Sequence, residues 1–127
     1  ESYKEDIYMK YNKFGECAIQ AYEKMRKEKC SALEAWITTA EELFGVGSSN
    51  SKKSCPKHAF LGVLDPYHKK SKNAVYALEV LEKLKKEPKE AFEKISKAEF
   101  WRERIKKTIQ HNSQIDVVLA LWSKGYI

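Results

Sequence analysis

Near its amino end the chain reads Asn12-Lys-Phe-Gly-Glu-Cys-Ala-Ile-Gln-Ala-Tyr-Glu-Lys-Met25, a run that indicates the class of the whole fold. Its apolar side chains recur every three or four residues, which matches the 3.6-residue turn of an α-helix and gathers them on one face. We therefore predict a helix over about residues 13–29, with Asn12 as its N-cap. The inward positions are Phe14, Cys17, Ala18, Ala21, Tyr22 and Met25.

The following residues predict a second helix. Ser31 is followed three residues later by Glu34, which is the spacing of a capping box. A helix over about residues 32–44 should end at Gly45 and Gly47, because glycine adopts the left-handed conformation at low cost. Its apolar stripe comprises Leu33, Trp36, Ile37, Ala40, Leu43 and Phe44.

The middle of the chain predicts one short helix and one longer helix. Pro56 suits the first position of the short helix, because an amide hydrogen would have no partner there. Asp65-Pro66 should end this helix. Ser71 is the expected cap of the longer helix, which should stop before Pro88.

The last third of the chain continues the helical pattern. Pro88 can open a short helix, and Ser96 with Glu99 is a second capping box, which predicts a helix that carries Trp101, Ile105 and Ile109. Ser113, with Asp116 three residues later, should start the final helix. The inner face of that helix contains Val117, Val118, Leu121 and Trp122.

The elements together predict the fold class. Apolar and polar residues do not alternate for the length of a strand, apart from a short stretch between Tyr3 and Tyr11. Trp36, Trp101 and Trp122 all lie on apolar stripes, so we expect them in the core. The prediction is an all-α fold, a compact single-domain bundle of about six or seven short helices.

Composition supports one domain away from a membrane. The chain has 127 residues, of which 43% are hydrophobic, and this is enough to build one core. No apolar run approaches the roughly 20 residues that span a bilayer, and the start of the chain lacks the pattern of a secretory signal. The three widely spaced cysteines fit neither a disulfide framework nor a zinc motif. We expect a cytoplasmic, or already processed, protein with reduced thiols.

The positive charge is concentrated in one part of the chain. The net charge is +6, and +5 of it lies between Gly45 and Lys72, where six lysines accompany a single acid, Asp65. This part begins Gly45-Val-Gly-Ser-Ser-Asn-Ser-Lys-Lys-Ser-Cys-Pro-Lys57, a flexible loop that leads into a helix. Lysine charge, free backbone amides and the helix dipole all favour an anion at such a place. The alternative is a solvated loop that only limits aggregation.

Cys55 is a candidate nucleophile, because a thiolate is favoured at a helix amino end between lysines. The candidate bases are His58, His111 and Asp116, and the alternative is that Cys55 is a small, inert residue near the start of its helix. Four polar residues, His111-Asn-Ser-Gln114, form a longer connector than one cap requires and are candidate ligand contacts. The alternative for this connector is a capping motif.

The predicted ligand-binding residues come from the basic loop, the helix that follows it and the polar connector. No metal is predicted, because the histidines and cysteines lack a standard spacing, and no cofactor is predicted. No phosphate-binding loop of the G-x-x-x-x-G-K-[ST] type occurs. The predicted set is Ser49, Lys52, Lys53, Ser54, Cys55, Lys57, His58, His111, Asn112 and Gln114.

Four segments resemble those of a known family. They read Asn12-Lys-Phe-Gly-Glu-Cys-Ala18, Ser54-Cys-Pro-Lys-His-Ala-Phe-Leu-Gly62, Asn73-Ala-Val-Tyr-Ala-Leu78 and His111-Asn-Ser-Gln-Ile-Asp-Val-Val-Leu-Ala-Leu-Trp122. From Asn12 onward the chain resembles a family of small bacterial proteins that is known only as a domain of unknown function. The resemblance implies no activity, substrate or catalytic residue. It does imply that residues 1–11 are an N-terminal extension of a single helical domain at residues 12–127.

Three functions follow as hypotheses. The first is a binding module for a phosphate-bearing ligand, either a nucleic-acid backbone or a small nucleotide, held by the basic loop and the helix amino end. The second is a helical interaction protein or accessory factor whose basic surface binds an acidic protein partner. The third is an enzyme in which Cys55 is the nucleophile and His111 the base.

Overall fold

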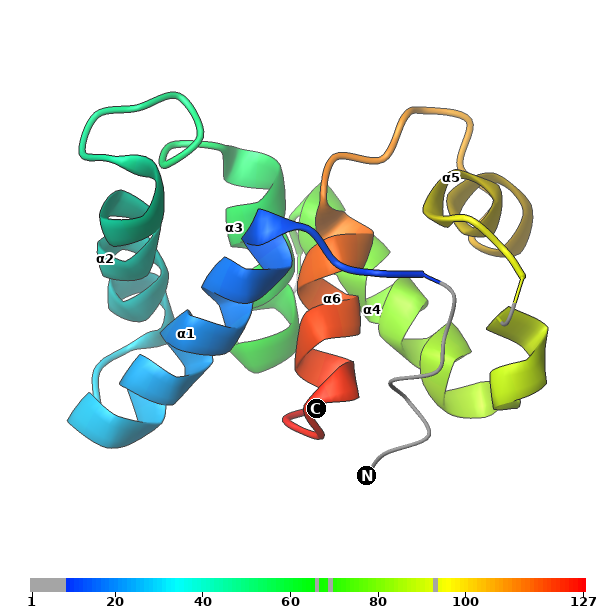
Figure 1. The fold of residues 1–127 in the computed structure, drawn as a ribbon, viewed down its shortest axis with the longest axis horizontal. Helices are drawn as coiled ribbons and strands as arrows, with labels where there is room; N and C mark the ends of the chain where they lie inside the picture. Colours follow the sequence, from blue (N-terminus) through cyan, green and yellow to red (C-terminus); the bar gives the residue numbers. More distant parts are fainter. Residues whose placement is uncertain (1–8, 66, 69, 93) are drawn as a thin grey trace.

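The computed structural model describes residues 9–65, 67–68, 70–92 and 94–127, and this part of the chain is helical without any strand (Figure 1). The prediction of an all-α fold is therefore confirmed. In chain order the elements are α1 (Lys13–Glu28), α2 (Ala32–Phe44), α3 (Ser54–Leu64), α4 (Lys72–Lys86), the 3-10 helix η2 (Lys89–Phe92), α5 (Lys97–Glu99), the π-helix η3 (Phe100–Arg104) and α6 (Gln114–Ser123).

Local capping explains where several of these helices begin. The Asn12 side chain accepts a 2.9 Å hydrogen bond from the Phe14 amide, so Asn12 is the N-cap of α1 as predicted. Ser31 and Ser71 accept from amides three residues later and cap α2 and α4. These bonds need only residues within one helical turn, which is why the sequence predicted them.

Helix α6 lies at the centre of the bundle, with α1, α3 and α4 packed around it (Figure 1). Every residue from Gln114 to Trp122 is buried, so α6 contacts other elements on all sides rather than on one face. The predicted face of Val117, Val118, Leu121 and Trp122 is confirmed as core, but Gln114 and Asp116 are buried as well.

Aromatic side chains fill the space around α6. The rings of Trp36 and Phe60 lie 5.1 Å apart between α2 and α3, and the Trp101 ring meets Tyr76 of α4 edge-on at 5.4 Å. All three tryptophans are at most 5% exposed, which confirms their predicted place in the core. They supply much of the apolar surface whose removal from water drives folding.

Two pairs of helices approach so closely that only glycine fits. A Cβ atom at Gly62 of α3 would lie 2.6 Å from the Cα atom of Ala74 in α4. A Cβ atom at Gly15 of α1 would lie 2.8 Å from the carbonyl oxygen of Asp116 in α6. Both distances are shorter than a normal contact, so these glycines set how near the helix axes can come.

Several sequence predictions are wrong in detail. Pro56 is the third residue of α3, which begins at Ser54 with Lys53 in the N-cap position. Ser113 precedes α6 in a left-handed conformation with φ of 69°, and its side chain makes no capping hydrogen bond. Leu33 and Ile37, predicted on the apolar stripe of α2, are 44% and 41% exposed, because α2 packs mainly against α1 and α3 among the described elements.

The predicted helix through Ile109 is also wrong. The capping box of Ser96 and Glu99 is present, but it opens only three residues of α-helix before the backbone widens into η3. Lys106 then takes a left-handed conformation with φ of 64°, which stops any helix. Ile109 lies in the irregular segment that follows and is 47% exposed.

The amino end contributes at least one residue to the core. Met9 is 4% exposed and packs in the same cluster as the residues around α6. Most of the predicted extension, and most of the stretch between Tyr3 and Tyr11, lies outside the described residues. Among the helices that the structure describes, none is long and apolar enough to cross a membrane.

Candidate functional site

The amino end of α3 lies at one end of the bundle, where a loop leads from α2 into α3 (Figure 1). No side chain caps this end, and no acid lies in the first turn of α3. The amides of Ser54 and Cys55 face outward from the first turn, as in any helix, whereas Pro56 has no amide hydrogen to add. Because Pro56 is the third residue of α3, the first turn offers the amides of Ser54 and Cys55 as donors and no third amide.

The loop before α3 is held by its own hydrogen bonds. Ser51 donates two hydrogen bonds to Ser48, one from its amide to the Ser48 hydroxyl at 3.1 Å and one from its hydroxyl to the Ser48 carbonyl at 2.8 Å. The Lys52 amide donates to the Ser49 carbonyl at 3.2 Å. Ser49 and Lys52 themselves are exposed, so the turns present them to solvent.

Lys53 connects this loop to the start of α6. Its ammonium group donates a 3.1 Å hydrogen bond to Oδ1 of Asn112, which is neutral, so the positive charge is not cancelled. Lys52 is exposed and Lys57 is half-buried. Within the described ranges, no carboxylate forms an ion pair with any of these three lysines.

Gln114 fixes the connector that precedes α6. Its side-chain oxygen accepts a 2.5 Å hydrogen bond from the Asn112 amide, and its side-chain nitrogen donates to Oδ1 of Asn73 in α4 at 2.8 Å. Gln114 is only 2% exposed. We conclude that it orients Asn112, while Asn112 and not Gln114 reaches the basic loop.

Asp116 ties three segments together from inside the bundle. Its Oδ1 atom accepts hydrogen bonds from the Asn12 amide, at 3.0 Å, and from the ammonium group of Lys97. Asp116 is 1% exposed, and its Oδ2 atom has no partner in the described structure. A buried carboxylate with a lysine partner is a structural anchor for α1 and α5 on α6.

His58 and His68 form a pair beside α3. Their rings stack 5.0 Å apart with an angle of 9° between the planes. Burial lowers the pKa of His58 below its ordinary value of 6.5, and the positive charge of Lys57 and the neighbouring His68 lower it further. A hydrogen bond to the Ser54 backbone opposes this change in pKa but does not reverse it. His58 is therefore mostly neutral near pH 7.

His111 lies beside Trp101. Its ring meets the edge of Trp101 at 6.2 Å, and its Nδ1 atom is buried without a hydrogen-bond partner among the described residues. Burial lowers the pKa of His111, an effect that Asp116 opposes and Lys97 strengthens. The contacts that the structure gives for His111 are with these groups, and Cys55 is not one of them.

The cysteines differ in their surroundings. Cys17 is fully buried, and burial raises the pKa of its thiol from 9.0 to about 12, with a smaller contribution from Glu16. Cys30 and Cys55 are half-buried, and none of the three is in a disulfide. No group of three or more metal-ligating side chains lies together in the described part of the chain.

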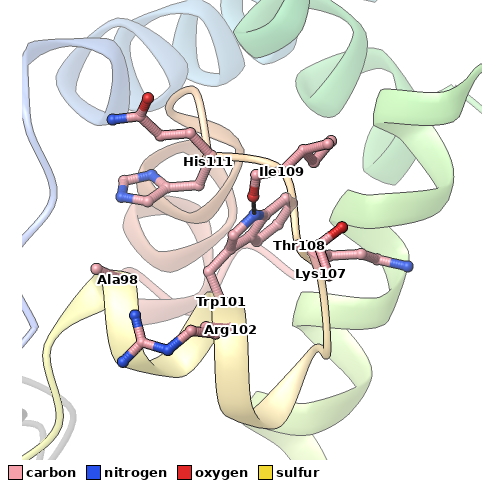
Figure 2. A pocket seen from close by; sticks show the side chains of 8 residues that line it. Ala98, Trp101, Arg102, Lys107, Thr108, Ile109 and His111 are labelled. Atoms are coloured by element: carbon pink, nitrogen blue, oxygen red, sulfur yellow. Dashed lines mark hydrogen bonds between the residues drawn. The ribbon is translucent and has the colours of Figure 1, made fainter.

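A cavity of about 370 Å³ lies between α5, η3 and the irregular segment before α6 (Figure 2). Figure 2 shows Trp101 between His111 and Ile109, with its indole nitrogen bonded to the Ile109 carbonyl. Of the predicted ligand-binding residues, only His111 lines this cavity. Its other lining residues include Ala98, Trp101, Arg102, Lys107 and Ile109.

The structure thus brings some of the predicted site residues together and separates the others. It brings Lys53 to Asn112 and Gln114, but His58 pairs with His68 and His111 turns to the cavity. Sequence reasoning missed Asn73 and Lys97, which hold Gln114 and Asp116. Neither residue has a local signal, because each contact joins positions 19 or more residues apart.

Fold and site define a small helical domain whose central helix has a polar, buried amino end next to an open basic loop. The chain belongs to the family of unknown function DUF6979, whose family model matches residues 11–127. The predicted membership of a family without known function is confirmed. No curated protein and no solved structure matches the chain.

Proposed function

We propose that this domain binds a phosphate-bearing anion at the amino end of α3. The observation that carries the proposal is the combination of an uncapped helix start with Lys52, Lys53 and Lys57, which have no carboxylate partner among the described residues. A phosphate group there would accept from free amides and meet the positive end of the helix dipole.

The hydrogen bond from Lys53 to Asn112 supports the same proposal. It holds one ammonium group in place before any ligand arrives, so less side-chain entropy is lost on binding. Because Asn112 is neutral, the ammonium group keeps its full attraction for an anion. Lys52 is exposed and remains free to adjust to ligands of different size.

The experiment compares two double variants of the full chain. Lys52→Gln with Lys57→Gln removes two charges at the proposed site, and Lys27→Gln with Lys85→Gln removes two exposed charges elsewhere. Each protein is titrated with a mixed-sequence single-stranded oligonucleotide and with ATP. Only the first double variant should lose affinity, by about tenfold or more. Equal losses in both variants, or no binding by the unsubstituted protein, would contradict the proposal.

The same titrations at two salt concentrations distinguish the two ligand classes. A site that tracks a nucleic-acid backbone releases many counterions, so its affinity falls steeply as salt rises. A site for a small nucleotide shows a milder dependence and a defined stoichiometry. Three free cysteines suit a reducing compartment such as the cytoplasm, where both ligands occur.

An acidic protein partner is the second candidate, and Val46 favours it. This residue is 82% exposed in the loop that carries Lys52, so an apolar side chain accompanies the positive charge. An acidic peptide with an apolar residue would contact both. The test is a pull-down with Lys52→Glu and Lys53→Glu, which should release the partner, whereas a partner that stays bound excludes this loop as the contact.

A further inference from the structure

We infer that the cavity lined by Trp101, Arg102 and His111 is a second binding site, which takes a small planar aromatic molecule that carries a carboxylate group. The inference is independent of the anion site at α3, since none of residues 45–57, the loop and the first turn of α3, lines this cavity. It rests on the size of the cavity, its walls, its charge and the backbone that shapes it.

The size and the walls suit a planar ring. At about 370 Å³ the cavity lies at the lower end of the range for small-molecule sites. His111 supplies aromatic surface and Ile109 with Ala98 supplies aliphatic surface, while Trp101, only 2% exposed, is the buried residue behind them. The indole nitrogen of Trp101 is already bonded to the Ile109 carbonyl at 2.7 Å, so Trp101 adds no hydrogen-bond donor to the cavity.

The charge of the cavity selects an anion. Arg102 and Lys107 line it, and no acid is among the lining residues. Lys107 points away from His111 (Figure 2), and its ammonium group forms a 3.0 Å ion pair with Glu79 of α4. Arg102 is the lining cation that can bind an anion, because its 3.5 Å ion pair with Glu103 joins two exposed side chains and is therefore weak. A guanidinium group binds a carboxylate through two parallel hydrogen bonds.

The backbone around the cavity is costly to form. The π-helix η3 contributes Trp101 and Arg102 to the lining of the cavity, and Lys106, two residues after η3, has φ of 64°. π-Helical turns and left-handed non-glycine residues are disfavoured and concentrate where they position functional groups. Here they place Trp101 and Arg102 on one side of the cavity, and the Trp101 bond to Ile109 holds the irregular segment on the other (Figure 2).

His111 completes the wall as a neutral ring. Its pKa is lowered by burial, so near pH 7 it adds aromatic surface and no charge. The carboxylate of the ligand then depends on Arg102 alone. Arg102 is therefore the residue that decides between a charged ligand and an uncharged ligand of the same shape.

The experiment uses 2-naphthoate and its uncharged counterpart 2-naphthamide as probes of the full chain. Binding is followed by NMR through the three tryptophan indole signals, of which only that of Trp101 reports on the cavity. We expect 2-naphthoate to move this signal at millimolar concentration and the amide to bind about tenfold more weakly. Arg102→Gln should reduce the preference, whereas Lys85→Gln, an exposed change on α4, should not.

A second variant fills the cavity without touching its charge. Ala98 is exposed in α5, so Ala98→Trp should fold and should block both probes. The inference is overturned if 2-naphthoate leaves the Trp101 signal unmoved, or if Ala98→Trp binds as the unsubstituted protein does. Equal affinity for the two probes overturns the assignment of a carboxylate. Loss of oligonucleotide or ATP binding at α3 has no bearing on any of these outcomes.

Discussion

The ammonium group of Lys53 lies 3.1 Å from Oδ1 of Asn112 and joins the start of α3 to the start of α6, 59 residues later. Asn112→Asp turns this neutral contact into an ion pair. The pair should leave stability nearly unchanged but cancel the charge that a phosphate group would meet, so affinity should fall by about fivefold. Isothermal titration with ATP measures the change. Gln20→Glu, an exposed change of equal charge on α1, is the control. An equal loss in that control would show that only net charge matters.

The pair of Lys97 and Asp116 should contribute measurably to folding. Asp116→Asn weakens the acceptor of both Lys97 and the Asn12 amide and should reduce the free energy of unfolding by about 2 kcal/mol. Lys97→Met removes the other partner. Urea denaturation of both single variants and the double variant gives a coupling energy, expected near 1 kcal/mol. If the changes in the free energy of unfolding are strictly additive, the contact between Lys97 and Asp116 does not stabilise the folded protein.

The contact between α3 and α4 should not tolerate one added methyl group. Gly62→Ala gains helix propensity of about 1 kcal/mol, but its Cβ atom would overlap Ala74. The helices must then separate, and we expect a net loss of about 2 kcal/mol in the free energy of unfolding. Thermal denaturation measures this, with Gln20→Ala as a change at an exposed helical position. A stabilised Gly62→Ala protein would show that α3 and α4 have room to move apart.

The lowered pKa values of His58 and His111 predict how stability depends on pH. Both groups bind protons less readily in the folded protein than in the unfolded chain, where the ordinary value is 6.5. Their contribution to stability is therefore complete above that value and is lost as pH falls through the lowered values. Denaturation in urea between about pH 7.5 and pH 5.5 should show this loss.

A double variant separates the two histidines from other groups that titrate. His58→Gln with His111→Phe removes both ionisable rings while keeping an aromatic contact with Trp101. Its stability should change less over the same pH interval than that of the unsubstituted protein. Identical slopes for the two proteins would assign the pH dependence to carboxylates instead.

The cysteines should differ sharply in reactivity. Cys17 is fully buried and its thiol pKa is raised to about 12, so it forms almost no thiolate near neutral pH. Iodoacetamide should label Cys30 and Cys55 in the native protein and reach Cys17 only after unfolding. Mass spectrometry of tryptic peptides measures the three rates. If Cys55 reacts much faster than Cys30, the hypothesis of a nucleophilic Cys55 gains support. Early labelling of Cys17 would reveal local opening of α1.

What the sequence predicts well is whatever lies within one turn of helix. Asn12, Ser31 and Ser71 cap the helices that they were expected to cap, because each bond needs only an amide two or three residues away. The apolar period likewise places Trp36 and Trp122 in the core. Periodicity also placed Trp101 and Ile105 in the core but failed at Ile109, because the left-handed Lys106 stops the helix and Ile109 lies exposed in the irregular segment that follows.

The sequence could not predict contacts between residues that are far apart in the chain, because these contacts depend on which helices pack together. The capping pattern of Ser113 and Asp116 was misleading, because Asp116 bonds instead to the Asn12 amide and to Lys97. Likewise, the sequence offered both His58 and His111 as candidate bases, but the structure stacks His58 on His68 and places His111 against Trp101. The loop lysines were found from composition alone, whereas the cavity has no sequence signal, since an irregular backbone shapes it.

The order of the elements has a consequence for biosynthesis. Helices α1, α3 and α4 leave the ribosome before α6, the segment against which all three pack. Until then α1 can pack against α2, and α3 against α4, but the apolar surfaces that later contact α6 stay exposed, and the nascent chain is open to premature association. Slower translation ahead of α6 would lengthen this vulnerable interval, so cells that make this protein would gain from a chaperone that shields emerging chains.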